Sequence, residues 1–393
     1  MFIHGFCPSY EVLNPCYCHS RPENSGFCAN NRSEDSFVCQ VPVITCAGDQ
    51  SFNLSQVFFK VNKSISEDNR KYFEWFYLSN TGITSLEANT LWGIHFKNVY
   101  IRQCDELKTI DPMAFTHSSQ FVKHIWINAT KLSDKIEDKR NTFRALNSLT
   151  NLKTMEVIGS RFTSIPSIAF NEYSSVKSIS FHNQKERQYL KKINTKAFHR
   201  LTHLKRIDLR HNRISKINSF AFSFETHSNQ TLRIHLEDNH LNGDSFSPNA
   251  LIGGNGRRVI LYLGGYDQCN EGLKRLDREV FEPFLLENKK NVIEMYGCPI
   301  ECDENAVWMD TRKNILTKRI KHLKCIPNMV LTKVKSNHII ISNQTSIEPK
   351  IKSLTKRRHK LESKSQKKSK NSKIKSKTKP NKTQMTLKIR LGV

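Results

Sequence analysis

The sequence predicts a protein of the α/β class in which short parallel strands stack into a solenoid. Three observations predict it: an apolar pattern recurs every 23 to 30 residues, phenylalanines recur between its copies, and cysteines gather at two ends. The pattern fits neither a continuous helix nor a continuous strand. Because one repeat cannot bury its own apolar edge, its neighbours must stack on it and both ends must be covered.

The repeat is seen most clearly in 204-LKRIDLRHNRISKINSFAF-222. Apolar residues occupy its first, fourth and sixth positions, and a hydrogen-bonding residue occupies the ninth. Copies begin at residues 73, 96, 122, 152, 176 and 204, a seventh contains Ile234, and a weaker eighth contains Leu261. The ninth position reads Asn62, Thr81, Cys104, Thr130, Ser160, Gln184, Asn212 and Asn239. The spacing approaches the period of about 20–29 residues that is typical of leucine-rich repeats.

Over about residues 55–290 the chain resembles the extracellular leucine-rich-repeat proteins. The resemblance implies a horseshoe with the parallel sheet on its concave face. It also implies that the ninth position turns inward to satisfy buried backbone groups, so that Cys104 is a buried thiol and not a nucleophile. Phenylalanines on the far side of the repeats are expected to stack as a spine: Phe115, Phe143, Phe170, Phe198, Phe222 and Phe281.

Cysteines mark a cap at each end. Six belong to the first group, Cys7, Cys16, Cys18, Cys28, Cys39 and Cys46, and four to the second, Cys269, Cys298, Cys302 and Cys325. We expect disulfides, with connectivity left open, in preference to zinc at the C-x-C pair. The segment PCYC resembles the N-terminal cap of secreted leucine-rich-repeat proteins, and 297-GCPIECDENAVWM-309 resembles the C-terminal cap, except that Glu304 replaces a cysteine.

Four segments are expected: a cap at 1–54, about eight repeats at 55–290, a second cap at 291–328 and a disordered Lys/Ser-rich tail at 329–393. The combination looks closest to arthropod secreted proteins that resemble the non-catalytic subunit of Oplophorus-luciferin 2-monooxygenase.

The cysteines predict an oxidising, extracellular compartment; a cytosolic protein with free thiols is the alternative. We expect glycosylation at Asn31, Asn53, Asn229 and Asn343. Asn62 is expected to stay unmodified in the inward column, and a glycan on Asn128 would crowd Trp126. The start, MFIHGFCPSY, lacks a signal pattern, so we interpret the signal peptide as missing from this chain. No apolar stretch is long enough to span a membrane.

Strand alternation predicts which side chains line the concave face. One zone carries Trp75, Tyr77, Tyr100, Arg102 and Trp126, and a second carries Arg206, Arg210 and Arg233 beside Asp208, His235 and Glu237. Exposed aromatic side chains are typical anchors for a protein partner. The alternatives are aromatics that pack on a neighbouring segment, and a charged zone that is only solvated.

Residues 350–393 contain 17 Lys/Arg and a single acid, Glu362, which is most of the chain's net charge of +26. This tail predicts salt-sensitive binding to sulfated glycans or other polyanions. A nuclear or nucleic-acid role, and a purely solubilising tail, are the alternatives.

The sequence contains no zinc-protease, nucleophile-elbow or phosphate-loop motif. His235, Glu237, Asp238 and His240 come nearest to a metal cluster, but we favour no metal there. We expect no cofactor, no small-molecule substrate and no catalysis. The predicted function is a secreted protein-recognition or scaffold protein. A matrix or cell-surface protein held by glycans, and a truncated receptor ectodomain, are the alternatives.

Overall fold

The computed structural model describes residues 7–23, 39–134, 142–170, 175–182, 189–265, 268–270, 272–309 and 315–326. The chain divides into a compact unit, Met1–Val330, and a second unit, Leu331–Val393. Cys28, Asn31, Asn343 and the basic tail at 350–393 lie outside the described residues.

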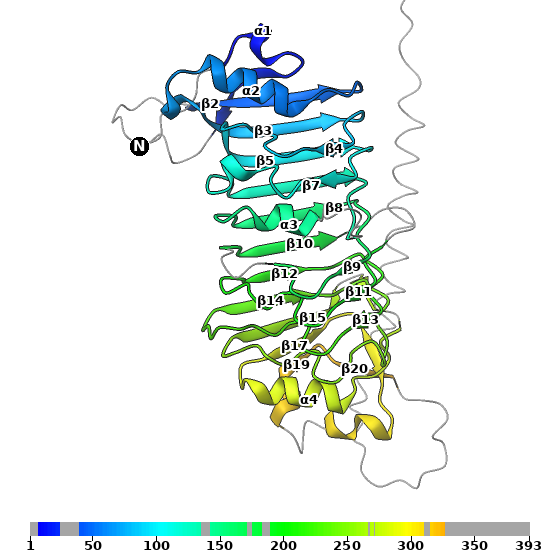
Figure 1. The fold of residues 1–393 in the computed structure, drawn as a ribbon. Coiled ribbons are helices and arrows are strands. Elements are labelled where there is room, and N and C mark those ends of the chain that lie inside the picture. Colours follow the sequence, from blue (N-terminus) through cyan, green and yellow to red (C-terminus); the bar gives the residue numbers. More distant parts are fainter. Residues whose placement is uncertain are drawn as a thin grey trace, which may run out of the picture. The chain divides into compact units, whose positions relative to one another are not determined.

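The described residues form one main sheet of 13 strands, stacked in chain order (Figure 1). All neighbouring strands are parallel except the first pair, β1 and β2, and the short strand β16 beside β15. The strands of this sheet are β1 (Tyr17–Glu23), β2 (Cys39–Gly48), β3 (Tyr72–Asn80), β5 (His95–Cys104), β7 (His124–Thr130), β8 (Thr154–Ile158), β10 (Ser178–His182), β12 (Arg206–Asp208), β14 (Thr231–His235), β15 (Arg258–Gly265), β16 (Gln268–Cys269), β17 (Val292–Met295) and β19 (Ile320–Lys321).

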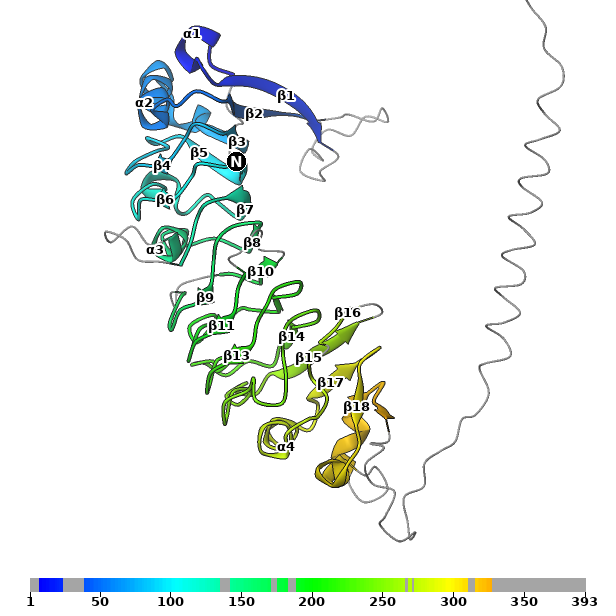
Figure 2. The same cartoon turned by 90° about the vertical axis from the view of Figure 1, so that its right-hand side faces the viewer.

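Short elements cover the other face of this sheet, as Figure 2 shows for α2, α3 and the small strands. The helices are α1 (Tyr10–Leu13), α2 (Leu54–Ser64), α3 (Thr142–Asn147) and α4 (Arg278–Glu287). The 3-10 helices are η2 (Asp68–Arg70), η3 (Thr116–Ser118), η4 (Glu304–Met309) and η5 (Ile315–Arg319). Minor strands are β4 (Ser85–Leu86), β6 (Thr109–Ile110), β9 (Ser164–Ile165), β11 (Lys192–Ile193), β13 (Lys216–Ile217), β18 (Pro299–Glu301) and β20 (Lys324–Ile326).

The core confirms the predicted solenoid of leucine-rich repeats. Ile207, Leu209 and Ile214 of the sixth copy have no exposed surface, like their counterparts in the other copies. The predicted phenylalanine spine is present: the rings of Phe170 and Phe198, and of Phe198 and Phe222, stack at centroid distances of 5.7 Å. Each ring therefore covers the apolar edge of the repeat before it, which a single repeat cannot do.

The inward column of hydrogen-bonding side chains is also present. Asn239 accepts from the backbone N–H of Ile214 at 2.9 Å and donates to the carbonyl of Leu209 at 2.9 Å. The Cys104 thiol is buried in the same column, with its sulfur 3.3 Å from the carbonyl oxygen of Arg102. Burial raises the pKa of this thiol to about 11, so it stays protonated and unreactive.

Two predicted members of the column were wrong. In the first repeat the buried residue is Asn80, whose side chain accepts from the backbone of Gly82 and Ile83, and Thr81 is exposed. This loop turns one residue earlier than in the other repeats. Asn62 lies in helix α2 and not in the column. At the far end Asn270, absent from the prediction, accepts from the backbone N–H of Asn239 at 2.9 Å.

Disulfides close both ends, as predicted. In the described part of the chain the N-terminal pairs are Cys7–Cys18 and Cys16–Cys46, and the C-terminal pairs are Cys269–Cys298 and Cys302–Cys325. Both ends also extend the sheet, because β2 pairs in parallel with β3 and β17 pairs in parallel with β15. The sheet therefore continues beyond residue 290, where the repeats were predicted to end.

We expect the stability of the fold to depend on pH through His95. Burial lowers its pKa to about 4, and its ring packs against Tyr72 and Phe121, at centroid distances of 4.8 and 4.1 Å. The charge of Lys71 adds to this lowering, and the backbone carbonyl of His117 opposes it. In the unfolded chain the pKa returns to about 6.5. The neutral ring therefore stabilises the fold above pH ~6.5, and this contribution is lost as pH falls from ~6.5 toward ~4.

We expect the unfolding free energy of the wild type to fall by about 2 kcal/mol more than that of His95→Gln between pH 7 and pH ~4.5. Urea unfolding at both pH values measures this difference. His203→Gln, at an exposed position, is the matched control and should keep the wild-type dependence. Equal pH dependence in wild type and His95→Gln would contradict the assignment.

Candidate binding face

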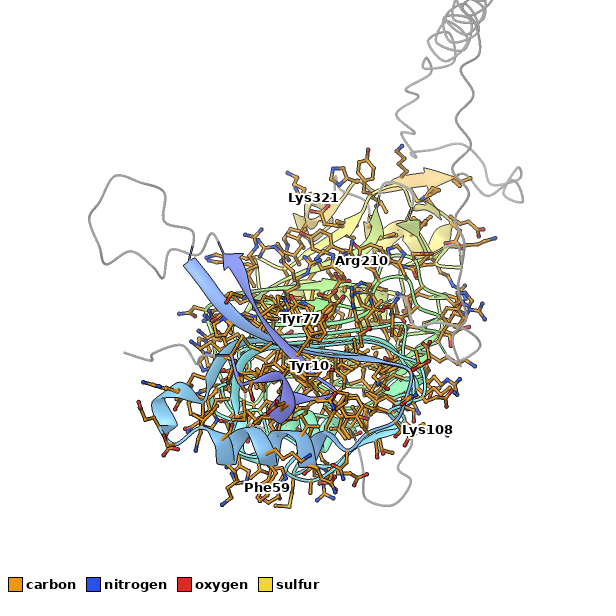
Figure 3. All side chains as sticks on the ribbon, turned by 90° about the horizontal axis from the view of Figure 1, so that it is seen from above. Tyr10, Phe59, Tyr77, Lys108, Arg210 and Lys321 are labelled. Carbon is orange, nitrogen blue, oxygen red and sulfur yellow. A yellow bond between two sulfur atoms is a disulfide. The ribbon has the colours of Figure 1, made fainter. Side chains whose placement is uncertain are left out.

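The exposed side of the main sheet, called here the sheet face, carries every residue predicted to bind. Apolar residues at alternate strand positions point into the core, so the residues between them point outward. Figure 3 shows Tyr77 and Arg210 on the sheet side of the molecule and Phe59 of α2 on the opposite side.

Four aromatic side chains on β3, β5 and β7 form one cluster, called here the aromatic cluster: Trp75, Tyr77, Tyr100 and Trp126. The Trp75 ring stacks on Tyr77 at 5.4 Å and on Trp126 at 5.5 Å. Tyr100 meets Tyr77 edge-on at 5.6 Å. All four side chains are partly exposed. The predicted aromatic zone is therefore assembled from three neighbouring strands, with its rings preorganised by one another.

Trp75 and Trp126 lie two strands apart, about 10 Å at the usual strand spacing. Their rings nevertheless stack at 5.5 Å, so they lean toward each other over the strand between them. Asn98, on that strand, occupies an outward position of the alternation but is only 4% exposed. It donates to the backbone carbonyl of Glu74 at 3.0 Å, which satisfies its amide beneath the rings.

Arg102 borders the cluster and is exposed, with its guanidinium 5.9 Å from the centre of the Tyr100 ring. This distance lies within the range of a cation–π contact. The aromatic cluster therefore has a cationic rim on the side of β5.

The charged zone differs from the prediction. Arg206 and Arg210 both donate to the carboxylate of Asp208, and the Nη2 atom of each lies 2.7 Å from Oδ2. Burial alone would raise the pKa of Asp208, but the hydrogen bonds from Arg210 and Arg206 outweigh it and hold the pKa far below its usual range. These two arginines are therefore committed to an internal ion pair, and Arg233 is the exposed cation of the predicted trio.

His235 and Glu237 were predicted to belong to the exposed charged zone, and this was wrong. They are 8% and 6% exposed, and His235 Nδ1 lies 3.0 Å from Glu237 Oε1. Tyr262 covers the imidazole at 4.3 Å with nearly parallel rings. An aromatic residue on the next strand thus covers the imidazole, which alternation within a single strand does not reveal.

A pocket of about 440 Å3 opens at the ends of these strands, lined among others by His182, His211, Asp238 and His240. His211 Nδ1 lies 2.7 Å from Asp238 Oδ2. Within the described residues, no three histidine, cysteine or acidic side chains are arranged to hold a metal ion. The His235–His240 segment that came nearest to a metal motif is therefore split between a buried pair and this pocket.

The described sequons differ in their surroundings. Asn229 is exposed, and Asn53 is an exposed N-cap of α2 whose Oδ1 accepts from the backbone N–H of Gln56 at 3.1 Å. Asn128 lies on β7 on the sheet face, two residues from Trp126. A glycan on Asn128 would therefore restrict access to the aromatic cluster.

No family model matches this chain, and no curated protein matches it. Two solved structures with partial likeness are a TLR13–ssRNA13 complex and the glycosylated Toll–Spatzle complex of Drosophila. The first has 15% identity and a TM-score of 0.40 over 70% of this chain and 38% of that chain. The second has 16% identity and a TM-score of 0.49 over 72% of this chain and 37% of that chain. The chain thus spans less than two-fifths of either protein.

No helix in the described ranges is both long enough and apolar enough to cross a membrane. The architecture itself, parallel strands stacked over an inward hydrogen-bonding column and a phenylalanine spine, is that of a leucine-rich-repeat solenoid.

Proposed function

We propose that this chain is a secreted, non-catalytic recognition or scaffold protein whose protein partner docks on the aromatic cluster. The observation that carries the proposal is the stacking of Trp75, Tyr77, Tyr100 and Trp126 into one partly exposed patch. Large, rigid aromatic side chains lose little entropy on binding and dominate interface energies. Arg102 at the rim adds a residue type that is enriched at interfaces.

The disulfides among the described residues support an extracellular location, since such bonds persist in oxidising compartments. Glycosylation at Asn53 and Asn229 is part of the same proposal. The resemblance to arthropod proteins similar to the non-catalytic luciferin-monooxygenase subunit favours a role as a partner subunit without chemistry of its own.

Two other roles stay open as proposals. In one, residues 350–393 hold the protein on sulfated glycans of a matrix or cell surface; in the other, the chain is part of a receptor ectodomain. The aromatic cluster favours protein recognition over attachment through the tail alone, because glycan binding by residues 350–393 does not require four stacked rings on the sheet face.

The test immobilises the wild type and Trp75→Ala/Trp126→Ala and exposes each to extracellular fluid from the source tissue. The affinity of each retained protein is then measured for both. Losing one hot-spot residue costs about 2 kcal/mol or more, and the losses of neighbouring hot spots do not add fully, so we expect affinity to fall at least ~30-fold in the double variant. Tyr10→Ala/Phe220→Ala is the matched control, because both residues are exposed aromatics outside the cluster.

A partner held equally by all three proteins would refute docking on the cluster. Peptide mapping of the natural protein with and without glycosidase supplies a second check. A fully occupied Asn128 would also count against the proposal, since its glycan would cover Trp126.

A further inference from the structure

Lysines occupy the same position in five consecutive repeats: Lys97, Lys123, Lys153, Lys177 and Lys205. Each is the second residue of its repeat, directly after the first apolar residue. We call these five side chains the lysine ladder. Lys97 lies near the start of β5, and the other four directly precede strands β7, β8, β10 and β12, so the five mark one edge of the main sheet.

Backbone hydrogen bonds show that the five residues are direct neighbours. The N–H of Lys123 donates to the carbonyl of Lys97 at 2.8 Å, and that of Lys153 to Lys123 at 2.7 Å. Lys177 donates to Lys153 and Lys205 to Lys177 in the same way, each at 2.8 Å. Successive rungs are therefore about 4.8 Å apart, and the ladder spans about 19 Å along the solenoid.

Acidic partners neutralise only one end of the ladder. Lys97 forms an ion pair with Glu74, which occupies the equivalent position in the preceding repeat. Within the part of the chain that the structure describes, Lys123, Lys153, Lys177 and Lys205 form no ion pair. Lys177 and Lys205 are exposed, and Lys123 and Lys153 are partly exposed. Four like charges on adjacent rungs repel one another, and a bound polyanion would relieve that repulsion.

The neighbouring imidazole of His124 is subject to the same positive field. Burial lowers the pKa of His124, and the charges of Lys97, Lys153 and Lys123 lower it further. The charges of three ladder lysines thus lower the pKa of the same imidazole, as expected where these charges share one surface.

We propose that the lysine ladder binds a linear sulfated polysaccharide whose axis runs along the solenoid, across successive repeats. A regular row of positive point charges matches a polymer that carries anionic groups at short intervals. Binding of this kind does not require contacts to the bases of a nucleic acid. The disulfides favour an extracellular glycan over a nucleic acid. The ladder shares no residue with the aromatic cluster or with residues 350–393, so the proposal does not depend on the proposed function.

The test measures binding of a size-selected heparin oligosaccharide to the full chain as a function of salt concentration. Lys123→Gln/Lys153→Gln/Lys177→Gln/Lys205→Gln removes the four unpaired rungs. The matched control, Lys60→Gln/Lys192→Gln/Lys289→Gln/Lys324→Gln, removes the same charge at exposed positions elsewhere. Both proteins keep residues 350–393, so the tail contributes equally to each.

Binding weakens as salt rises, and each ionic contact contributes about 0.7–0.9 to the steepness of log K against log salt. We therefore expect this steepness to be smaller by about three in the ladder variant than in the wild type. The control should keep most of its slope, and replacing the four ladder residues by arginine should preserve binding. The pair variants Lys123→Gln/Lys153→Gln and Lys177→Gln/Lys205→Gln should each lose about half as much. Covalent lysine labelling should show the four rungs protected by the oligosaccharide.

Equal slopes in the ladder and control variants, or unprotected rungs, would overturn the proposal. Single-stranded RNA that binds more tightly than the oligosaccharide through the same rungs would overturn the assignment to a glycan. Trp75→Ala/Trp126→Ala should bind the oligosaccharide like the wild type, which separates this test from that of the protein-binding cluster.

Discussion

Replacing Asn239 by alanine is expected to lower the free energy of unfolding by about 3–5 kcal/mol. The side chain is 5% exposed and accepts from the backbone N–H of Ile214 at 2.9 Å. It also donates to the carbonyls of Leu209, at 2.9 Å, and Leu236, at 3.1 Å. Alanine would leave these backbone groups buried without their partner, and each unsatisfied group costs about 1–3 kcal/mol.

Denaturant unfolding followed by far-UV circular dichroism measures this effect. Asn229→Ala is the matched control, because Asn229 is exposed and lies in the connection between two strands. It should change stability by less than about 0.5 kcal/mol. A loss below ~1 kcal/mol for Asn239→Ala would mean that water replaces the side chain, and that the column does not hold adjacent repeats together.

The fold could be predicted from the sequence because its determinants repeat. A position that is apolar in six copies is buried for the same reason in each, and the phenylalanine spine follows in the same way. Even the unusual Cys104 was placed correctly, because neighbouring copies carry hydrogen-bonding residues in its column. The error at Thr81 arose because the chain turns one residue earlier after β3, so Asn80 takes the buried position and accepts from the backbone N–H of Ile83.

The candidate site was only partly predictable, because alternation gives the direction of a side chain but not what covers it. The aromatic cluster was predicted as a zone, whereas the lean of Trp75 and Trp126 over Asn98 depends on packing between strands. Likewise, the charge pattern did not reveal that Asp208 holds both Arg206 and Arg210. The lysine ladder was visible in the sequence as a repeated second position, yet its significance depends on the direct pairing of its rungs.

The N-terminal disulfides determine how firmly the first repeat is covered. Cys16 and Cys46 are fully buried, and Cys46 lies in β2, the strand that pairs with β3 at the start of the repeats. Their bond joins residues 30 apart in sequence, whereas Cys7–Cys18 joins residues 11 apart. The longer loop loses more entropy when it is closed, so its crosslink stabilises the fold more.

Cys16→Ala/Cys46→Ala is therefore expected to lower the unfolding free energy by about 3–4 kcal/mol, and Cys7→Ala/Cys18→Ala by about 1 kcal/mol less. Thermal unfolding of the oxidised variants and of the chemically reduced wild type measures both effects. The ranking of the two pairs is the critical result, because chain entropy predicts it from loop length. Equal heat resistance of the reduced and oxidised wild type would show that the cap covers the first repeat without its crosslinks, by the pairing of β2 with β3 alone.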